Sequence, residues 1–212
     1  MAELRTLVYL DVLQPQVAGF LGTVSQGYLP IEGQASIYVE IAPGMEINVA
    51  CDAALKATSV QPGMLIVERE FGVLEAHSWD QGMVREAGRA IIDRLGLKGE
   101  DDRLKPVVIS QQTITGIDPH HTMLVNRMRH GDLILKNQTY FVMETHPAGY
   151  AVFAANEAEK AADISVLEFR AFGAFGRVYL AGSEAEIEEA AKAAVHGLQR
   201  ITGRDNKVLA GR

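Results

Sequence analysis

The chain has 212 residues, of which 48% are hydrophobic, and a formal net charge of −7 at pH 7. This length allows one large domain or two smaller ones with packed cores, and the acidic balance argues against nucleic acid and anionic membranes as partners. The single cysteine, Cys51, excludes an intrachain disulfide and suits a reducing compartment. No apolar run is long enough for a membrane span or a signal peptide, so we expect a cytoplasmic protein.

The first half of the chain carries alternating strand and helix signals. Segments rich in Val, Ile, Tyr and Leu predict strands, and segments rich in Ala, Glu and Lys predict helices. Pro15 is suited to the first turn of a short helix, and Pro43-Gly44 ends a strand. In chain order we expect a strand at 4–13, a short helix from 15, a strand at 36–41, a helix at 45–58, strands at 64–70 and 72–78, and a helix at 81–95.

Local signals also mark turns and helix ends. Phe71-Gly72 lies between two strand segments and predicts a hairpin there. Asp80 is a suitable N-cap, and Gly96 follows the last residue of the same predicted helix. In the second half Ser183 precedes a segment that begins with glutamates, which a helix N-terminus favours.

The sequence repeats itself without a gap at an offset of 104 residues. The identical positions include prolines, glycines and charged residues outside the alanine-rich helices, which argues against a chance match between two such helices. The pairs include Pro15 and Pro119, Gly27 and Gly131, Gln34 and Gln138, Glu40 and Glu144, Lys56 and Lys160, and Phe71-Gly72 and Phe175-Gly176. We therefore expect two tandem domains of the same fold.

The boundary between the copies is predicted near residue 100. The segment 97–106, LKGEDDRLKP, is charged and ends at a proline, which is typical of a solvated linker. This gives a first domain at 3–98 and a second at 106–203. The residues 204–212 are expected to form a loose tail.

Several phrases of both copies carry a family resemblance. EIAPGMEINVACDAALKATSV followed by IVEREFGVLEAH, and NEAEKAADISVLEFRAFGAFGRVYLAG in the second copy, resemble the shell domain of bacterial microcompartments. The strand that precedes a Pro-containing turn comes first in each copy instead of last, so the domains look circularly permuted. Residues 3 to 202 as a whole are similar to the permuted tandem-domain shell proteins of carboxysomes and related compartments.

This resemblance implies a fold and an assembly. The fold class is α/β (α+β), with two tandem permuted domains that each contain a ferredoxin-like sheet with packed helices. A homotrimer would place six domains in a pseudohexagonal tile with a gated central pore, and some family members stack two trimers face to face. The implied partners are other copies of the chain, shell hexamers and pentamers, and small metabolites that pass the pore. The protein would then be a structural component, without enzymatic activity or cofactor, in the shell of a cytoplasmic microcompartment.

Two lysines fall where the family places its tile-edge lysine. They are Lys56 and Lys160, whose long side chains could lie across a neighbouring tile and donate to backbone carbonyls there. The family often pairs this lysine with Arg-Pro, but here Gln14-Pro15 and Asp118-Pro119 occupy those positions. The alternative interpretation is that both are solvated lysines on helix surfaces.

The resemblance also assigns the pore to the hairpins. The first copy would contribute Glu68 and Arg69, whereas the second would contribute the uncharged Phe172 and Gly173 at the matching positions. Such a ring alternates charged and uncharged loops, and two arrangements of one hairpin could open and close it. The remaining predicted pore residues are Glu70, Phe71, Gly72, Phe175 and Gly176. Without the resemblance, an exposed hairpin whose charges keep it soluble would be the simpler interpretation.

Two functions from other classes remain as alternatives. A metal-dependent enzyme could use the histidines of DPHH, His120 and His121, but adjacent histidines in an extended segment point to opposite faces and no HExxH or CxxC is present, so we expect no metal site. No histidine partner is evident for a catalytic Cys51. A small-molecule-sensing trimer of ferredoxin-like domains would share the size and acidity of this chain. It would differ in staying a soluble trimer rather than entering shells.

Overall fold

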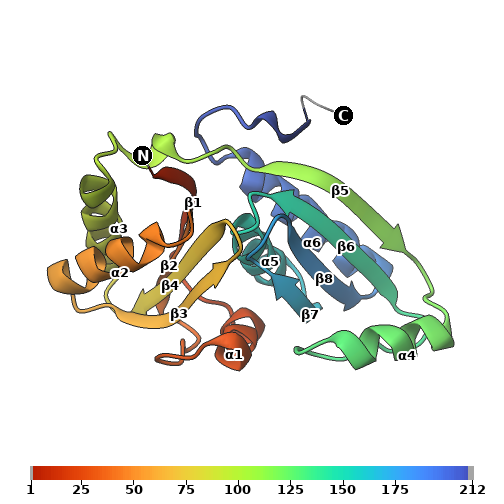
Figure 1. The fold of residues 1–212 in the computed structure, drawn as a ribbon. Helices are drawn as coiled ribbons and strands as arrows, with labels where there is room; N and C mark the ends of the chain where they lie inside the picture. Colours follow the sequence, from red (N-terminus) through yellow and green to blue (C-terminus); the bar gives the residue numbers. More distant parts are fainter. Residues whose placement is uncertain (1, 210–212) are drawn as a thin grey trace.

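The computed structural model describes residues 2–209 and has two α/β halves, each built on a four-stranded antiparallel sheet (Figure 1). The strand orders are β1-β2-β4-β3 and β5-β6-β8-β7. The first half contains β1 (Glu3–Leu10), α1 (Pro15–Val24), β2 (Ala35–Ala42), α2 (Glu46–Ala57), β3 (Gln61–Glu68), β4 (Phe71–Ser78) and α3 (Gln81–Leu95). The second contains β5 (Val107–Ile114), α4 (Pro119–Met128), β6 (Thr139–His146), α5 (Tyr150–Ala161), β7 (Ser165–Arg170), β8 (Gly176–Gly182) and α6 (Glu184–Gln199).

The two halves repeat each other element by element. Strand β5 begins at Val107, which is 104 residues after Glu3, and the same offset relates α1 to α4 and α2 to α5. The peptide bonds Ala42-Pro43 and His146-Pro147, also 104 residues apart, are both cis. The predicted fold class and order of elements are confirmed.

The helix ends follow the local chemistry of the sequence. Asp80 Oδ1 accepts the Gly82 N–H, and Gly96 ends α3 with φ 68, a left-handed conformation that glycine adopts without steric cost. Ser183 and Glu186 form a reciprocal capping box at the start of α6. These three caps are the ones that the sequence predicts.

Each sheet packs one face against two helices. In the first half, Ile37, Val39 and Ile41 point towards α2 and α3 and are completely buried. Small residues such as Ala50 and Ala87 let these helices approach the sheet closely. The opposite face of the first sheet contacts the second half, because one hydrophobic cluster contains Val8, Tyr38 and Met64 together with residues of α5 and β7.

The segment between the halves differs from the solvated linker expected at 97–106. It contains a short 3₁₀ helix (Glu100–Asp102), and Arg103 and Leu104 are buried. The Arg103 Nη1 donates to the Leu7 carbonyl over 2.6 Å, and the Leu104 carbonyl accepts from the Tyr150 hydroxyl. The charged composition predicted an exposed segment. Arg103 is nevertheless buried, because its guanidinium donates to backbone carbonyls and so remains hydrogen-bonded.

The segment 204–212, expected to be a loose tail, is partly attached to the rest of the chain. The Arg204 Nη2 donates to the Leu4 carbonyl (3.2 Å), and the Asn206 amide donates to the carbonyls of Lys105 and His146. A 3₁₀ helix (Lys207–Leu209) follows. Residues 210–212 of the predicted tail lie outside the described residues.

Candidate functional site

The first candidate pore hairpin connects β3 to β4 through a two-residue turn. Glu68 pairs with Phe71 across the ladder, so the turn consists of Arg69 and Glu70 rather than the expected Phe71-Gly72. The Arg69 side chain is 90% exposed, and its Nε lies 3.8 Å from Glu68 Oε1. An ion pair this exposed contributes little to stability. Both charged side chains are therefore available to a neighbouring molecule or a solute.

The backbone of Arg69 has an uncommon conformation. Its φ is 54, in the left-handed region that non-glycine residues rarely adopt. Such a residue typically stores on the order of 1–3 kcal/mol of strain, and strained residues cluster at functional sites. The strain makes the hairpin tip a candidate for a segment with two conformations.

Phe71 and Gly72 are the first two residues of β4 and lie directly after the turn of this hairpin. The guanidinium carbon of Arg5 lies 3.8 Å from the centre of the Phe71 ring, a cation–π contact. Gly72 is buried, and a Cβ there would lie 2.1 Å from the Gly44 carbonyl oxygen, so only glycine fits. In the second half Gly176 is buried against the Ala148 carbonyl in the same way.

The second candidate hairpin is longer and uncharged at its tip. It connects β7 to β8 through residues 171–175, with Gly173 at φ 92. The Ala171 carbonyl accepts from the buried Tyr38 hydroxyl of the first half (2.9 Å), and Phe172 packs against the cluster shared by the two halves. A Cβ at Gly173 would lie 3.9 Å from Cγ of Glu68. The charged turn and the uncharged loop of one chain therefore lie side by side.

A buried polar network joins the two halves beneath these hairpins. Glu40 is fully buried; its Oε1 accepts from Arg5 Nε (2.7 Å), and its Oε2 accepts from the Thr6 hydroxyl and the Gly149 N–H (2.7 Å). Burial raises the pKa of Glu40, and the Arg5 charge and these hydrogen bonds act against that shift. The repeat pairs Glu40 with Glu144, but nothing in the sequence indicates that Glu40 binds the backbone of the other half.

His146 completes the network at the base of the second hairpin. Its Nε2 lies 3.1 Å from the Arg5 Nη2 and its Nδ1 lies 3.1 Å from the Asn206 Oδ1, which suits a neutral ring that accepts at Nε2 and donates at Nδ1. Burial first, and the Arg5 charge second, lower the pKa of His146. The ring centre of His146 also lies 5.8 Å from that of Phe175.

The predicted edge residues occupy different settings. Lys160 and Gln14 line one shallow hollow where the two halves meet, and the Gln14 N–H donates to the Asn156 Oδ1 (3.0 Å). Lys56 is exposed and its Nζ lies 2.6 Å from the Asp52 carboxylate. Lys56 lies at the end of α2 and Asp118 lies at the start of α4, in different halves. The Lys160 and Gln14 positions, in contrast, line a common hollow within one chain, although they too belong to different halves.

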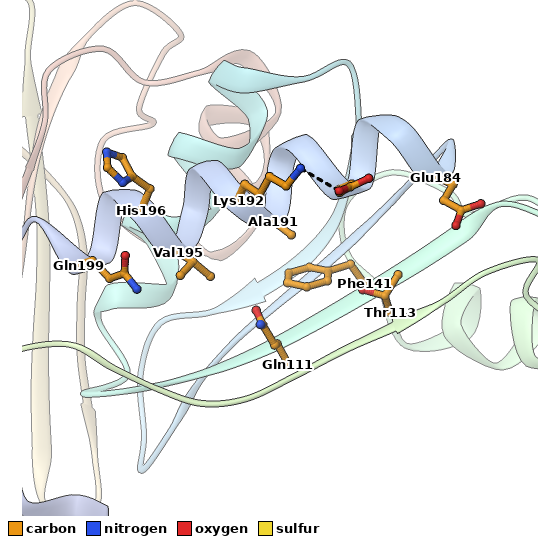
Figure 2. Close-up of a pocket in the computed structure, with 10 residues that line it drawn as sticks. Gln111, Thr113, Phe141, Glu184, Ala191, Lys192, Val195, His196 and Gln199 are labelled. Carbon is orange, nitrogen blue, oxygen red and sulfur yellow. Dashed lines mark ion pairs between the residues drawn. The ribbon is translucent and has the colours of Figure 1, made fainter.

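A groove on the second half lies between α6 and the strands β5 and β6 (Figure 2). Gln111 and Thr113 line one side, and Lys192, which pairs with Glu188 over 2.8 Å, lines the other. In the first half the positions equivalent to Gln111 and Thr113 carry Leu7 and Tyr9, and Leu7 is completely buried. The groove exists in the second half because polar β5 residues replace the apolar side chains of β1.

Within residues 2–209 no group of three or more His, Cys, Asp and Glu side chains is placed to hold a metal ion. His120 and His121, expected in an extended segment, instead lie in the first turn of α4, where Asp118 Oδ1 accepts both of their N–H groups. Cys51 is buried, and burial raises the pKa of its thiol, which disfavours the reactive thiolate. None of the described helices has the length and apolar character needed to span a membrane.

Comparisons with known sequences give consistent relatives. The family model described as CsoS1D N-terminal domain matches residues 4–101. The chain is 50% identical over 204 residues to the carboxysome shell protein CcmP of Synechococcus elongatus, covering 96% of this chain and 95% of that protein. It is 49% identical over 205 residues to the carboxysome shell protein CsoS1D of Hydrogenovibrio crunogenus, covering 96% and 100%.

Two solved structures have closely similar folds. The fused permuted hexameric shell protein MSM0275 from the RMM microcompartment is 44% identical with a TM-score of 0.92, over 95% of this chain and 99% of that one. The double ringed trimeric shell protein MSM0271 from the same microcompartment is 38% identical with a TM-score of 0.93, over 97% and 100%.

Proposed function

Because the chain belongs to the family of carboxysome shell proteins that includes CcmP and CsoS1D, we propose that it is a structural protein of a bacterial microcompartment shell. The observation that carries this function is sequence identity of about half along almost the whole chain, together with a tandem fold that matches two other shell proteins. The protein resides in the shell and acts without enzymatic chemistry or a cofactor. Its two domains extend over 3–98 and 106–203.

Three copies of the chain form a pseudohexagonal tile with a pore on its threefold axis. The support within one chain is the side-by-side placement of the two hairpin tips, with the Gly173 position next to the Glu68 side chain. A threefold axis beside this pair generates a ring in which three charged turns alternate with three uncharged loops. The ring admits small metabolites, and the tile meets shell hexamers and pentamers along its edges through Lys56 and Lys160.

The charged turn acts as the gate of this pore. Three copies of Arg69 around one axis repel each other, and Glu68, at the end of β3 next to each Arg69, offsets this repulsion. The exposed and weakly paired side chains, together with the strained backbone at Arg69, suit a segment that changes between two arrangements. The uncharged loop is held by Tyr38 through the Ala171 carbonyl and serves as the fixed part of the ring.

A crosslinking experiment tests the pore assignment. Arg69→Cys in a Cys51→Ala background should give covalent trimers with a short trifunctional maleimide, because three copies of the turn surround one axis. Arg89→Cys is the matched control, since Arg89 is similarly exposed, at 72%, but lies on α3. Equal crosslinking of the two variants would contradict the pore assignment. A wild-type protein that is monomeric by native mass spectrometry and absent from purified shells would contradict the proposed shell function.

A further inference from the structure

Strand β5 lies at the edge of the second sheet and has no strand beside it on its outer side. Within residues 2–209 the sheet edges are formed by β1, β3, β5 and β7. The other three strands contain charged side chains, whereas β5, with the sequence VVISQQTI, contains no charged residue and no proline. Charges and prolines on an edge strand hinder the addition of a further strand. The outer edge of β5 therefore lacks the usual protection against strand pairing.

The equivalent edge of the first sheet is covered by the segment that connects the two halves. The Leu104 N–H donates to the Arg5 carbonyl (3.1 Å), and the Arg103 guanidinium donates to the Leu7 carbonyl (2.6 Å). The segment runs antiparallel to β1, because its earlier residue meets the later residue of the strand. Both Arg103 and Leu104 are buried. The first half thus shows how an extended segment can occupy this edge.

The second half has the same acceptors at its edge. The offset of 104 residues relates the carbonyls of Ile109 and Gln111 to those of Arg5 and Leu7, and the register shift at Arg5 in β1 recurs at Ile109 in β5. Within residues 2–209 no hydrogen bond from outside the sheet reaches either of these two carbonyls. The acceptors that the connecting segment satisfies in the first half are therefore open in the second.

The segment after α6 does not cover this edge, although it corresponds to the connecting segment in the repeat. Residues 201–209 correspond to 97–105 at the offset of 104. Arg204 nevertheless donates to the Leu4 carbonyl, and Asn206 donates to the carbonyls of Lys105 and His146. These bonds hold the segment against the first half and the end of β6. The edge of β5 is left for a partner from outside the chain.

The groove beside this edge provides room for the side chains of an added segment (Figure 2). In the first half Tyr9 fills the equivalent space and packs on Gly88, where a Cβ would collide with the Tyr9 hydroxyl. In the second half Thr113 and Lys192 occupy these two positions, and the groove remains open above Phe141. An added strand could place every second side chain in this groove.

The helical wall of the groove is acidic at one end. The first six residues of α6, EAEIEE, include four glutamates, and Lys192 pairs with one of them, Glu188, over 2.8 Å. Figure 2 shows Glu184 at the same end of the groove as Thr113. A second copy of this chain, with a net charge of −7, would be repelled here, whereas lysine and arginine side chains would be attracted. The charge therefore favours a basic segment over a second copy.

We propose that the edge of β5 and the groove beside it bind an extended, basic segment of a partner protein by strand addition. The segment lies antiparallel to β5, donates to the Ile109 and Gln111 carbonyls, and places lysine or arginine side chains against Glu184 and Glu188. Its backbone hydrogen bonds provide affinity, and the side chains in the groove provide specificity. This inference goes beyond the proposed shell function and needs the surface of only one chain.

Synthetic peptides test the site on the full-length protein. The probe is a fluorescein-labelled peptide of four alternating lysine and valine pairs, whose binding is measured by fluorescence anisotropy. This peptide should bind, and a peptide with glutamate in place of lysine should not. A third peptide keeps the lysines but has every backbone amide N-methylated, so it cannot donate to the strand edge. Its dissociation constant should be higher by on the order of tenfold or more.

Two substitutions in the protein test the acidic wall. Glu184→Gln with Glu188→Gln should weaken binding of the lysine peptide by on the order of tenfold, because two attractive charges are lost. Glu32→Gln with Glu86→Gln is the matched control, since both residues are exposed in the first half and the charge change is the same. This control variant should bind the peptide as the wild type does.

A second pair of substitutions tests the groove itself. Thr113→Tyr with Lys192→Gly installs the pair that fills this space in the first half, and should weaken binding although it removes a positive charge from the site. In the wild-type protein the peptide should slow amide hydrogen exchange in residues 107–114 and leave residues 81–95 of α3 unchanged.

The outcomes separate this site from the shell function. Failure of the lysine peptide to bind, equal binding of its N-methylated form, or unchanged exchange in residues 107–114 would overturn the proposal. Equal binding by the variant at Glu184 and Glu188 and by its matched control would also overturn it. A protein that binds the peptide at β5 but is monomeric and absent from shells would support this site and contradict the shell function.

Discussion

Arg5 and Glu40 form an ion pair that is almost entirely removed from water, with exposures of 7% and 0%. Burying two charges is costly, and the pair is tolerated because Thr6 and the Gly149 N–H fill the remaining acceptor positions of the carboxylate. The pair joins the first sheet to the second half. It therefore links the stability of one domain to the correct docking of the other.

Removing one partner of this pair should be strongly destabilising. Arg5→Met leaves a buried carboxylate without its cation and is expected to lower the free energy of unfolding by about 3–5 kcal/mol. Arg85→Met is the matched control, because Arg85 also pairs with a carboxylate and lies near an aromatic ring but is half exposed; its cost should be under about 1 kcal/mol. Equal urea midpoints for the two variants would contradict this role for Arg5.

His146 should make stability depend on pH. Its pKa is lowered in the folded state by burial and by Arg5, so the unfolded chain binds more protons between that lowered pKa and about 6.5. The free energy of unfolding should therefore rise with pH through this window, and the contribution of His146 should be constant above and below it, where both states bind the same number of protons. His146→Gln should flatten this part of the profile measured by urea denaturation, whereas substitution of the exposed His196 should leave it unchanged.

At the scale of elements, the sequence predicted those features, such as helix caps, that depend on residues close together in the chain. Asp80, Gly96 and Ser183 cap helices that they adjoin, and their signals lie within a few residues. The bonds from Glu40 to Arg5 and to Gly149 span 35 and 109 positions, and no local pattern encodes them. The burial of Arg103 in the connecting segment was missed for the same reason.

The cap of α1 offers a test of how the two copies diverged. Glu159→Leu installs the residue found at the equivalent position in copy one, and should cost about 1 kcal/mol because two N–H groups of α1 lose their acceptor. Adding Gln14→Asp installs the self-capping residue of copy two and should restore most of this loss. Urea denaturation of the single and double variants measures both steps, and a double variant no more stable than Glu159→Leu would show that the caps are not interchangeable.

At the scale of the whole molecule, internal duplication explains why the fold of each half could be predicted from the sequence. It also explains why the contacts between the halves could not be predicted. The repeat of 104 residues indicates two equal domains, but the docking of α1 and the exposure of α4 arise only when the copies are placed together. The predicted pore residues fall into two groups in the structure, one at the tips of the hairpins and one buried below them. Arg69 and Gly173 lie at hairpin tips, whereas Gly72 and Gly176 are buried beneath them.

The edge assignment gives a prediction for assembly into shells. Lys56 and Lys160 are exposed at the ends of equivalent helices, so reversing both charges should leave the trimer intact. Lys56→Glu with Lys160→Glu should nevertheless reduce incorporation into shells, because contacts to neighbouring tiles would change from attractive to repulsive. Lys192→Glu with Lys98→Glu carries the same charge change at other sites and should enter shells normally. Incorporation of the first pair at the wild-type level would refute the edge assignment.

The last prediction concerns the gate. Glu68 and Arg69 are the ion-paired side chains that three chains bring to one axis in the proposed tile, and their mutual ion pair, with 3.8 Å between the closest atoms, is too exposed to stabilise the fold. Replacing both by Ala removes the groups that close the opening and the pairings that hold either arrangement, so the pore should remain open. The free energy of unfolding should change by less than about 1 kcal/mol, since Ala retains the Cβ and the turn can keep its backbone. A trimer structure of the double variant measures the opening directly. If these turns still sealed the axis, or if the wild-type structure placed them far from it, Glu68 and Arg69 would not be the gate. The proposed shell tile would be unaffected by that result.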